Sequence, residues 1–301
     1  MADLLTECRP DDPTDPELLR YNWTHRWEGW FHERRAVLVD GRAVGYLACY
    51  HPPWEREPQR YGRFDLRLLA SHRQLMPALL RAVERRLLEE GAQIFRTESY
   101  EDEEWLRREL ENQMYRVART ERAWELDLER HRERLLELAA RSRARVAGTV
   151  RLATLAEVGE IWGPLTELFN ETAQDVPSTV PILPDSEAEV REQMQAPSVR
   201  ADRVWLAMAG RRPVAASFLA YPPVRGHVWT DYTCCARSHR GRGIGRAVKM
   251  ETIAQAVELG VPRLRTLNDS ENAPIIHINQ TLGYEPIHGP VEYVKPAVRP
   301  G

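Results

Sequence analysis

The segment RGRGIGR at residues 240–246 constrains this chain more than any other stretch of its sequence. It separates a run that predicts a strand (227–236) from a run that predicts a helix (244–258). Its three glycines let backbone N–H groups approach an anion closely, because no Cβ stands in the way. The start of the helix adds unpaired N–H groups and the positive end of the helix dipole. The segment therefore predicts a binding site for a phosphate or a diphosphate.

Two common phosphate-binding motifs do not fit this segment. A P-loop requires lysine and then serine or threonine after its second glycine, whereas isoleucine and glycine follow Gly243. A dinucleotide fingerprint requires a third glycine at position 246 or 248, and these positions hold Arg246 and Val248. The pattern that fits is Arg-x-x-Gly-x-Gly, which begins at Arg240 and ends at Gly245.

Composition predicts a soluble protein with two domains. A chain of 301 residues suits two domains of ordinary size, and apolar residues make up 43% of it. The net charge of −3 does not favour nucleic acid as a partner. No apolar run approaches the roughly 18 residues that span a bilayer, and the charged start of the chain does not resemble a signal peptide. We therefore expect a cytoplasmic protein with no membrane partner.

The four cysteines are Cys8, Cys49, Cys234 and Cys235. Neighbouring residues of a strand point to opposite faces, so Cys234 and Cys235 are badly placed to share a metal or a disulfide. This usage is typical of the reducing cytosol. We expect no metal cofactor.

Hydrophobic periodicity and turn residues predict two α/β units joined by a helical linker. The first unit (1–128) begins with a proline-rich stretch (1–25) for which little order is expected. A hairpin is predicted at Asp40-Gly41. Strand, helix, strand, helix and strand then follow at 63–69, 72–90, 94–99, 101–112 and 123–128. The charged segment 129–148 predicts the linker.

The second unit (149–301) repeats this order of elements. Capping boxes at Thr154 and Ser186 predict the starts of two helices, the first reaching about Asn170. A hairpin is predicted around Gly210. The other predicted elements are a strand at 227–236, a helix at 244–258, a strand at 263–268, a helix at 273–282 and strands at 284–287 and 291–295.

Short sequence matches also relate the two units. The triplet Ser-His-Arg occurs at residues 71–73 and again at 238–240. After the first triplet, Gln74, Met76 and Ala78 stand where the second unit has its three glycines. Their side chains would occupy the space that an anion needs. The first copy is therefore expected to be degenerate.

The Arg-x-x-Gly-x-Gly pattern resembles the acetyl-CoA-binding turn of the GNAT acetyltransferase superfamily. Residues 266–284 (TLNDSENAPIIHINQTLGY) are similar to the family segment in which an asparagine begins a helix and a Leu-Gly-aromatic triplet ends it. The chain therefore resembles a tandem GNAT protein, with a strong copy over roughly 149–297 and a weaker one over roughly 30–128. The resemblance implies two α/β domains, each a mostly antiparallel mixed sheet with splayed central strands and flanking helices.

The resemblance also implies acetyl-CoA as co-substrate. The pantetheine arm would extend the splayed strand as an added strand does, and the amides of 241–246 would hold the diphosphate. A backbone N–H near Cys235 would polarise the thioester carbonyl. The candidate cofactor-binding residues are Thr233, Cys234, Cys235, Ala236, Arg240, Gly241, Arg242, Gly243, Ile244, Gly245, Arg246, Asn272 and Asn279.

Three residues are the candidates for proton transfer. Asp231 lies two residues before Thr233 and is expected to share its face of the strand. Asp175 lies in a proline-bounded loop that would cover the acceptor. Many GNAT enzymes have a tyrosine at the position of Asn279 to protonate the leaving thiolate, which an amide cannot do, so Tyr284 is the candidate general acid. Solvated surface charge is the alternative for each carboxylate.

The sequence favours an N-acetyltransferase that transfers acetyl to a primary amine by direct attack in a ternary complex. Glu167 and Glu171, one helical turn apart, are further candidate bases. A cysteine intermediate is not favoured, because no histidine or aspartate motif would activate the thiol. A non-catalytic acyl-CoA-binding or assembly protein is the alternative, and a nucleotide-binding regulator is a third. The small-molecule or peptide amine acceptor is not specified, and a homodimer remains open.

Overall fold

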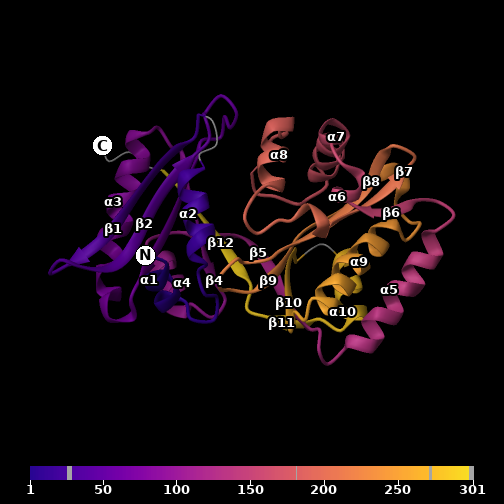
Figure 1. Cartoon of the computed structure of the whole chain (residues 1–301). Helices are drawn as coiled ribbons and strands as arrows, with labels where there is room; N and C mark the ends of the chain where they lie inside the picture. The colour runs from indigo at the N-terminus through magenta and orange to yellow at the C-terminus, as the bar shows by residue number, and fades with distance from the viewer. Residues whose placement is uncertain (26–28, 181, 271–272, 298–301) are drawn as a thin grey trace.

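Two lobes lie side by side in the computed structural model, which describes residues 1–25, 29–180, 182–270 and 273–297 (Figure 1). The first half of the chain forms most of one lobe, and the second half forms most of the other. Both lobes share one continuous mixed sheet.

The described residues of the first half form five strands and the helices that connect them. The strands are β1 (Phe31–Val39), β2 (Arg42–His51), β3 (Tyr61–Leu68), β4 (Ile94–Tyr100) and β5 (Arg116–Asp127). The helices are α1 (Ala2–Cys8), α2 (Pro16–Thr24), the 3₁₀ helix η1 (Ala70–Leu75), α3 (Met76–Glu89), α4 (Glu104–Asn112) and α5 (Arg132–Val146).

The second half repeats this arrangement with additions. Its strands are β6 (Arg151–Thr154), β7 (Val204–Ala209), β8 (Arg212–Ala220), β9 (Val228–Cys235), β10 (Arg263–Asp269), β11 (Glu285–Ile287) and β12 (Pro290–Pro296). Its helices are α6 (Leu155–Val158), α7 (Trp162–Ala173), α8 (Glu187–Met194), η2 (Ala201–Arg203), η3 (Arg237–His239), α9 (Ile244–Glu258) and α10 (Ala273–Leu282).

Each lobe completes its part of the sheet with a strand from the other half of the chain. The strand order is β1-β2-β3-β4-β12-β5-β10-β9-β8-β7-β6, and β11 pairs with β5 outside this path. The last strand, β12, is antiparallel to both β4 and the start of β5. The rest of β5 pairs with β10 and β11. Separating the lobes would therefore break rows of backbone hydrogen bonds. The predicted boundaries at residues 128 and 149 separate the two units along the chain, but strands from each unit pair with strands of the other.

The parallel central strands of each lobe separate soon after they meet, as the sequence analysis expects. The strands β9 and β10 pair at Val228 with Leu264 and at Trp229 with Arg265. Beyond these pairs, β9 has β8 as its hydrogen-bonded neighbour in the described structure. The strands β3 and β4 pair in the same limited way, over Tyr61–Arg63. The separated part of β9 thus has an edge of backbone groups that a ligand can reach.

Helix α9 is buried on two sides. One side packs against the sheet, and α5, the predicted linker helix, covers the other. On α5, the Nε and Nη2 atoms of Arg143 donate hydrogen bonds to the two carboxylate oxygens of Glu251 on α9, over 2.9 and 2.7 Å. The linker helix is therefore part of the core around α9.

The first 25 residues are more ordered than the sequence analysis expects. They form α1 and α2, and Asp15 caps α2 by accepting hydrogen bonds from the N–H groups of Glu17 (2.8 Å) and Leu18 (3.0 Å). The other carboxylate oxygen accepts from the N–H groups of Val224 (2.6 Å) and Arg225 (2.9 Å) in the second lobe. A tertiary contact more than 200 residues away along the chain orders this segment, which local composition does not reveal.

The helix predicted from Thr154 to about Asn170 is interrupted. Its capping box forms, but α6 ends after one turn at Gly159, whose φ is 79° and ψ is −150°. The chain then restarts as α7. Glycine alone adopts this conformation readily, so the break lies at the residue best suited to it. Among the helices of the described ranges, none combines the length and apolarity needed to cross a bilayer.

Replacing Asp15 with alanine is expected to lower the free energy of unfolding by about 2 kcal/mol, because four backbone donors lose their acceptor. Burial would raise the pKa of Asp15, but the backbone hydrogen bonds outweigh it and lower the pKa overall. The stabilisation is therefore present above the unfolded-state pKa and is lost as the pH falls through the folded-state value. Urea denaturation at neutral and acidic pH measures both effects. Asp11→Ala, at an exposed neighbouring side chain, is the control; equal losses in both variants would contradict the assignment.

Candidate functional site

The glycine segment forms an open turn between β9 and α9. Gly241 and Gly243 have φ values of 75° and 82°, and Gly243 is the N-cap of α9 without a side-chain cap. A Cβ at Gly245 would lie 3.3 Å from the Cβ of Cys235, so this glycine lets the helix pack closely on the strand. The turn thus presents N–H groups of the first helical turn to an anion.

Three arginines surround the turn, and the sequence analysis missed one of them. Arg145, in the last turn of α5, lies so that its Nε would be 3.4 Å from a Cβ at Gly243. The sequence analysis assigned Arg145 to the linker, because the residues next to it in the chain do not indicate that it contacts α9. The Nε of Arg246 is buried and has no hydrogen-bond partner among the described residues. Arg240 adds a third positive charge, and an unpaired donor among these cations fits a diphosphate group.

The first lobe lacks this turn, in agreement with the expected degeneracy. The 3₁₀ helix η1 runs directly into α3, and the backbone N–H of Met76 at the junction is already used, because it donates to the carbonyl oxygen of Arg73. The N-cap, Leu75, has right-handed helical angles (φ −78°, ψ −16°) instead of the left-handed conformation of Gly243. Met76 is 1% exposed and fills the core at this point.

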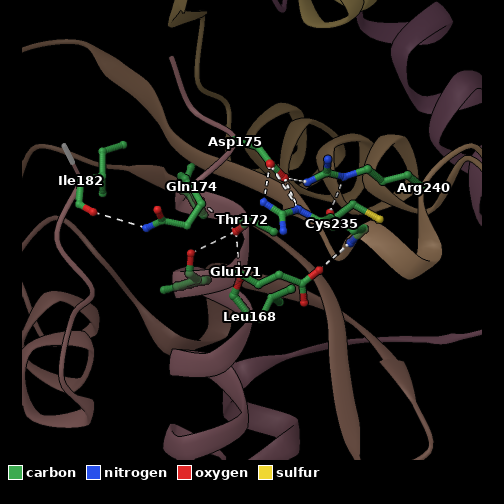
Figure 2. A network of polar contacts seen from close by, with 11 residues as sticks. Leu168, Glu171, Thr172, Gln174, Asp175, Ile182, Cys235 and Arg240 are labelled. Carbon is green, nitrogen blue, oxygen red and sulfur yellow. Dashed lines mark hydrogen bonds and ion pairs between the residues drawn. The ribbon is translucent and has the colours of Figure 1, made fainter. Parts of the chain in front are cut away.

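Asp175 is paired with arginines, which disfavours its predicted role as a base (Figure 2). Arg237 donates to its Oδ1 from Nη2 (2.6 Å) and to its Oδ2 from Nε (3.0 Å). Arg240 donates to Oδ2 from Nη2 (2.5 Å) and to the carbonyl oxygen of Cys235 from Nε (3.0 Å). These hydrogen bonds from Arg237 and Arg240 lower the pKa of Asp175 to about 2. A carboxylate with so low a pKa is a weak base at neutral pH.

Glu171 on α7, a further candidate base, is also engaged, because it accepts a hydrogen bond from the backbone N–H of Arg237 (2.7 Å). Figure 2 shows Glu171 and Asp175 at the end of α7, facing the residues that lead into the glycine turn. Glu167 lies at the surface and pairs with Arg212 (2.9 Å). The carboxylates on and just after α7 are thus engaged by arginine residues, through side chains at Glu167 and Asp175 and through the backbone N–H of Arg237 at Glu171.

A β-bulge at Asp231 overturns the expectation that Asp231 and Thr233 share a face. Leu219 pairs with Thr230 and Phe218 pairs with Tyr232, which leaves Asp231 as an extra residue in β9. One extra residue reverses the alternation of side chains along the strand. The Thr233 hydroxyl accordingly faces α9 and lies 2.9 Å from Ser217 Oγ, whereas Asp231 lines a cavity on the other side.

That cavity has a volume of about 710 Å³ and lies between the lobes. Residues of both halves form its walls, among them Trp23, Arg34, Arg67, Glu98, Asp185 and Asp231. The Asp231 carboxylate is open to the cavity but surrounded by protein on its other sides, and the resulting desolvation raises its pKa. No cation pairs with this carboxylate in the described structure, so it is free to attract one from solution.

The two cysteines of β9 have different surroundings but similar chemistry. Cys234 is 7% exposed, and burial raises the pKa of its thiol to about 12. Burial also raises the pKa of Cys235. Neither thiol has the lowered pKa of an activated nucleophile. Ala236 continues the pairing with β8 through its N–H, which donates to the carbonyl oxygen of Val214 (2.8 Å).

Tyr284 and Asn279 are buried in the core beside β10. Tyr284 is 4% exposed, and burial raises the pKa of its hydroxyl, which makes it a poor proton donor near neutral pH. Asn279 is fully buried, and both ends of its amide are hydrogen-bonded, to Lys249 and to Asn268. It is therefore not free to bind a cofactor directly in this conformation. Asn272 lies outside the described residues.

The pairing of Asp175 with Arg237 and Arg240 predicts competition with a bound anion. Asp175→Asn removes the negative charge, so the two arginines are expected to bind inorganic pyrophosphate roughly two- to fivefold more tightly. Titration calorimetry at low ionic strength measures the change. The control is Glu167→Gln on α7, the helix that precedes Asp175; Glu167 pairs with Arg212 at the surface, and its replacement is expected to leave the affinity unchanged. A lower affinity in Asp175→Asn would show that the carboxylate positions the arginines for the anion.

Solved structures with the same architecture cover essentially the whole chain. A tandem GNAT protein from the clavulanic acid biosynthesis pathway has a TM-score of 0.76 at 17% identity, over 100% of this chain and 94% of that one. A GCN5-related N-acetyltransferase from Sphaerobacter thermophilus has a TM-score of 0.71 at 16% identity, over 100% and 92%. One from Kribbella flavida has a TM-score of 0.54 at 15% identity, over 98% and 96%. No protein-family model and no curated protein matches the sequence.

The similarity covers both lobes, because the whole chain is matched in each of the first two structures. At these identities it establishes the architecture and leaves the reaction to be argued from the residues. The chain therefore has the tandem GNAT fold that its glycine turn and internal repeat predict.

Proposed function

We propose that this protein is an acetyl-CoA-dependent N-acetyltransferase whose second lobe transfers an acetyl group to a primary amine by direct attack in a ternary complex. One observation carries the proposal. Strand β9 has a free backbone edge that ends at the anion-binding turn, and its bulge directs Asp231 into the cavity between the lobes. A donor bound along that edge and an acceptor in the cavity would meet at this strand.

The residues around the turn suit the phosphates of the donor. The N–H groups at the start of α9 and the side chains of Arg145, Arg240 and Arg246 would hold the diphosphate. The open edge of β9 would hydrogen-bond to the pantetheine arm. Acetyl-CoA would supply an acyl group activated as a thioester.

Asp231 is the candidate base. The acceptor amine arrives as an ammonium ion and must lose a proton before its lone pair can attack. A carboxylate that has no cationic partner attracts this ammonium, and its raised pKa makes it a better proton acceptor than an ordinary aspartate.

The walls of the cavity favour an acceptor that carries an anionic group besides its amine. On the side of the second lobe, Asp185 resembles Asp231, because desolvation raises its pKa and no ion pair neutralises it among the described residues. In the first lobe, the Arg34 guanidinium donates to the backbone carbonyls of Asn22 (3.1 Å) and Trp23 (3.5 Å) and pairs with no carboxylate among the described residues. Amino acids and peptides with a free carboxylate have both groups.

The four cysteines are free thiols, which suits a reducing compartment, and we place the reaction in the cytoplasm. The partner we propose is a small-molecule or peptide amine. The rival function is acyl-CoA binding without catalysis, and the absence of a tyrosine at position 279 is the observation behind it.

Calorimetry with acetyl-CoA, followed by a free-thiol assay over paired amines, tests the function. Each amino acid is compared with the corresponding amine that lacks a carboxylate; turnover of the amino acids supports the proposal, and a preference for the simple amines would contradict the role of Arg34.

Gly243→Glu is expected to abolish acetyl-CoA binding, because it adds a negative charge beside Arg145 at the turn. Gly210→Glu, at a hairpin glycine with positive φ and open space around it, is the matched control. Binding without turnover on any amine would favour the rival.

Asp231→Asn is expected to lower kcat/KM by about a hundredfold or more. The wild-type rate should rise with pH as Asp231 loses its proton, at a pH above the ordinary aspartate range, and the variant should lose this rise. Affinity for acetyl-CoA should be unchanged, because Asp231 faces the cavity and not the turn. Glu192→Gln removes another carboxylate of the same cavity and is expected to keep the pH profile. An unaltered profile in Asp231→Asn would exclude this aspartate as the base.

A further inference from the structure

A buried lysine lies between α9 and α10. Lys249 is 2% exposed, and its Nζ donates a hydrogen bond to Oδ1 of Asn279 on α10 (3.1 Å). The amide nitrogen of Asn279 in turn donates to Oδ1 of Asn268 on β10. The three side chains therefore form a chain of hydrogen bonds from α9 to the sheet.

This cluster lies where β9 and β10 separate. Asn268 is three residues beyond Arg265, the last residue of β10 that pairs with β9, and Thr230 is the first residue of β9 beyond its pairing with β10. The Nζ of Lys249 lies 5.5 Å from the centre of the Tyr284 ring. The hydroxyl groups of Tyr284 and Thr230 are buried and face each other, and no other hydrogen-bond partner meets them within the described residues. Buried polar groups gathered beside the lysine, where the strands separate, indicate a site for a polar group.

Packing alone does not account for a lysine at this point. Its ammonium has three donors and makes one hydrogen bond in the described structure, so its burial is costly. The first lobe also has a lysine over its equivalent tyrosine, because the Nζ of Lys295 lies 5.2 Å from the centre of the Tyr115 ring, but that lysine pairs with Glu84 over 2.8 Å. No carboxylate pairs with Lys249 among the described residues. The fully buried positions of the first lobe's helices hold hydrocarbon side chains, which are Met76, Leu80, Val83 and Leu87 on α3 and Leu106 and Leu110 on α4.

The choice of lysine is also unusual for this chain. Lys249 and Lys295 are its two lysines among 42 basic residues, and all the others are arginines. Arginine stays charged in proteins, whereas a buried lysine can lose its proton and regain it. A position that requires proton exchange would select lysine.

We propose that Lys249 is the general acid that protonates the sulfur of the leaving coenzyme A. The inference rests on the proposed function, and Asn279 is then a positioning residue. The resemblance to GNAT enzymes implies a tyrosine at the position of Asn279, and here the amide oxygen of Asn279 instead accepts a hydrogen bond from the ammonium of Lys249. The lysine thus takes over the task that an amide cannot perform.

The protons and electrons of this step balance. The lone pair of the acceptor amine attacks the carbonyl carbon, the C–S bond breaks, and its electron pair passes to sulfur. Lys249 gives sulfur a proton, so that coenzyme A leaves as a thiol. The acceptor loses two protons overall, of which one restores Lys249 and the other passes through Asp231 to solvent.

The surroundings of Lys249 suit this task. Burial lowers the pKa of Lys249 to about 8, so it is mostly protonated at neutral pH and releases its proton more readily than an exposed lysine. The nearby titratable groups are engaged elsewhere or neutral. Glu251 on α9 pairs with Arg143, Asp269 of β10 pairs with Arg119, and burial raises the pKa values of Tyr284 and Cys235, which stay neutral.

The first test uses two variants and a readout of turnover. Lys249→Leu introduces the type of side chain that the first lobe uses, so the protein is expected to fold, and kcat should fall by about a hundredfold or more. The wild-type rate should decline as the pH rises above about 8, and Lys249→Leu should lose this decline. Lys249→Arg keeps the charge but cannot give up a proton, so its rate should also fall. A rate in both variants within a factor of two of wild type would overturn the proposal.

The second test does not depend on turnover. With two lysines in the chain, ¹³C-lysine labelling gives two side-chain NMR signals, and Lys295→Arg assigns them. The Lys249 signal should change its titration when free coenzyme A binds. The ultraviolet absorbance of the bound thiolate should show a lower thiol pKa in wild type and Lys249→Arg than in Lys249→Leu.

The outcomes separate the inference from the proposed function. An unchanged Lys249 titration and an equal thiol pKa in all three proteins would place the lysine away from sulfur and overturn the inference, whatever the rates. If the wild-type protein shows both effects but acetylates no amine, the contact between Lys249 and sulfur is supported and the proposed transferase function is rejected. Lys295→Leu, at the lysine above Tyr115 in the first lobe, is the matched control and should leave the thiol pKa unchanged.

Discussion

The separation of β9 from β10 is the constraint on which the rest of this structure depends. Two parallel strands normally stay hydrogen-bonded along their length, because unpaired backbone groups in a core are costly. Here they part after Trp229 and Arg265, and the space between them must be filled by something polar. The glycine turn lies at one end of that space, and the cluster of Lys249 and Asn279 lies near the point of separation. The anion-binding turn and the cluster around Lys249 therefore both lie beside the place where the pairing of these two strands ends.

The exchange of strands explains how a lobe without an anion-binding turn still contributes to the site. Because β12 lies between β4 and β5, and β5 continues into the sheet of the second lobe, the first lobe is held in a set position beside β9. Its own turn is closed by η1 and Met76, so it does not compete for the same anion. What it provides is a polar wall, including Arg34 and Arg67, opposite Asp231. A cleft whose two walls are joined by one continuous sheet is a suitable place to orient an acceptor.

Local sequence patterns predicted much of the fold and part of the site. The bounds of α9 match the prediction of 244–258, the hairpin turns at Asp40 and Gly41 with positive φ at both residues, and the two capping boxes form. These features depend on residues within a few positions of one another, which is the range over which turn chemistry and helix periodicity act. The resemblance to a tandem GNAT protein came from the same short patterns, and the fold confirms it.

Apart from the helix break at Gly159, the errors concern contacts between segments that are distant in the chain. The sequence by itself determined that an anion-binding turn precedes α9 and that the chain repeats one unit twice, because glycine conformation and hydrophobic spacing are local properties. Only the tertiary structure decided that a bulge turns Asp231 toward the cavity, that Asp175 is held by Arg237, that Arg145 reaches the turn from α5, and that Lys249 is buried against Asn279. A side chain's charge state and direction depend on its neighbours in space, and the order of residues along the chain does not specify those neighbours.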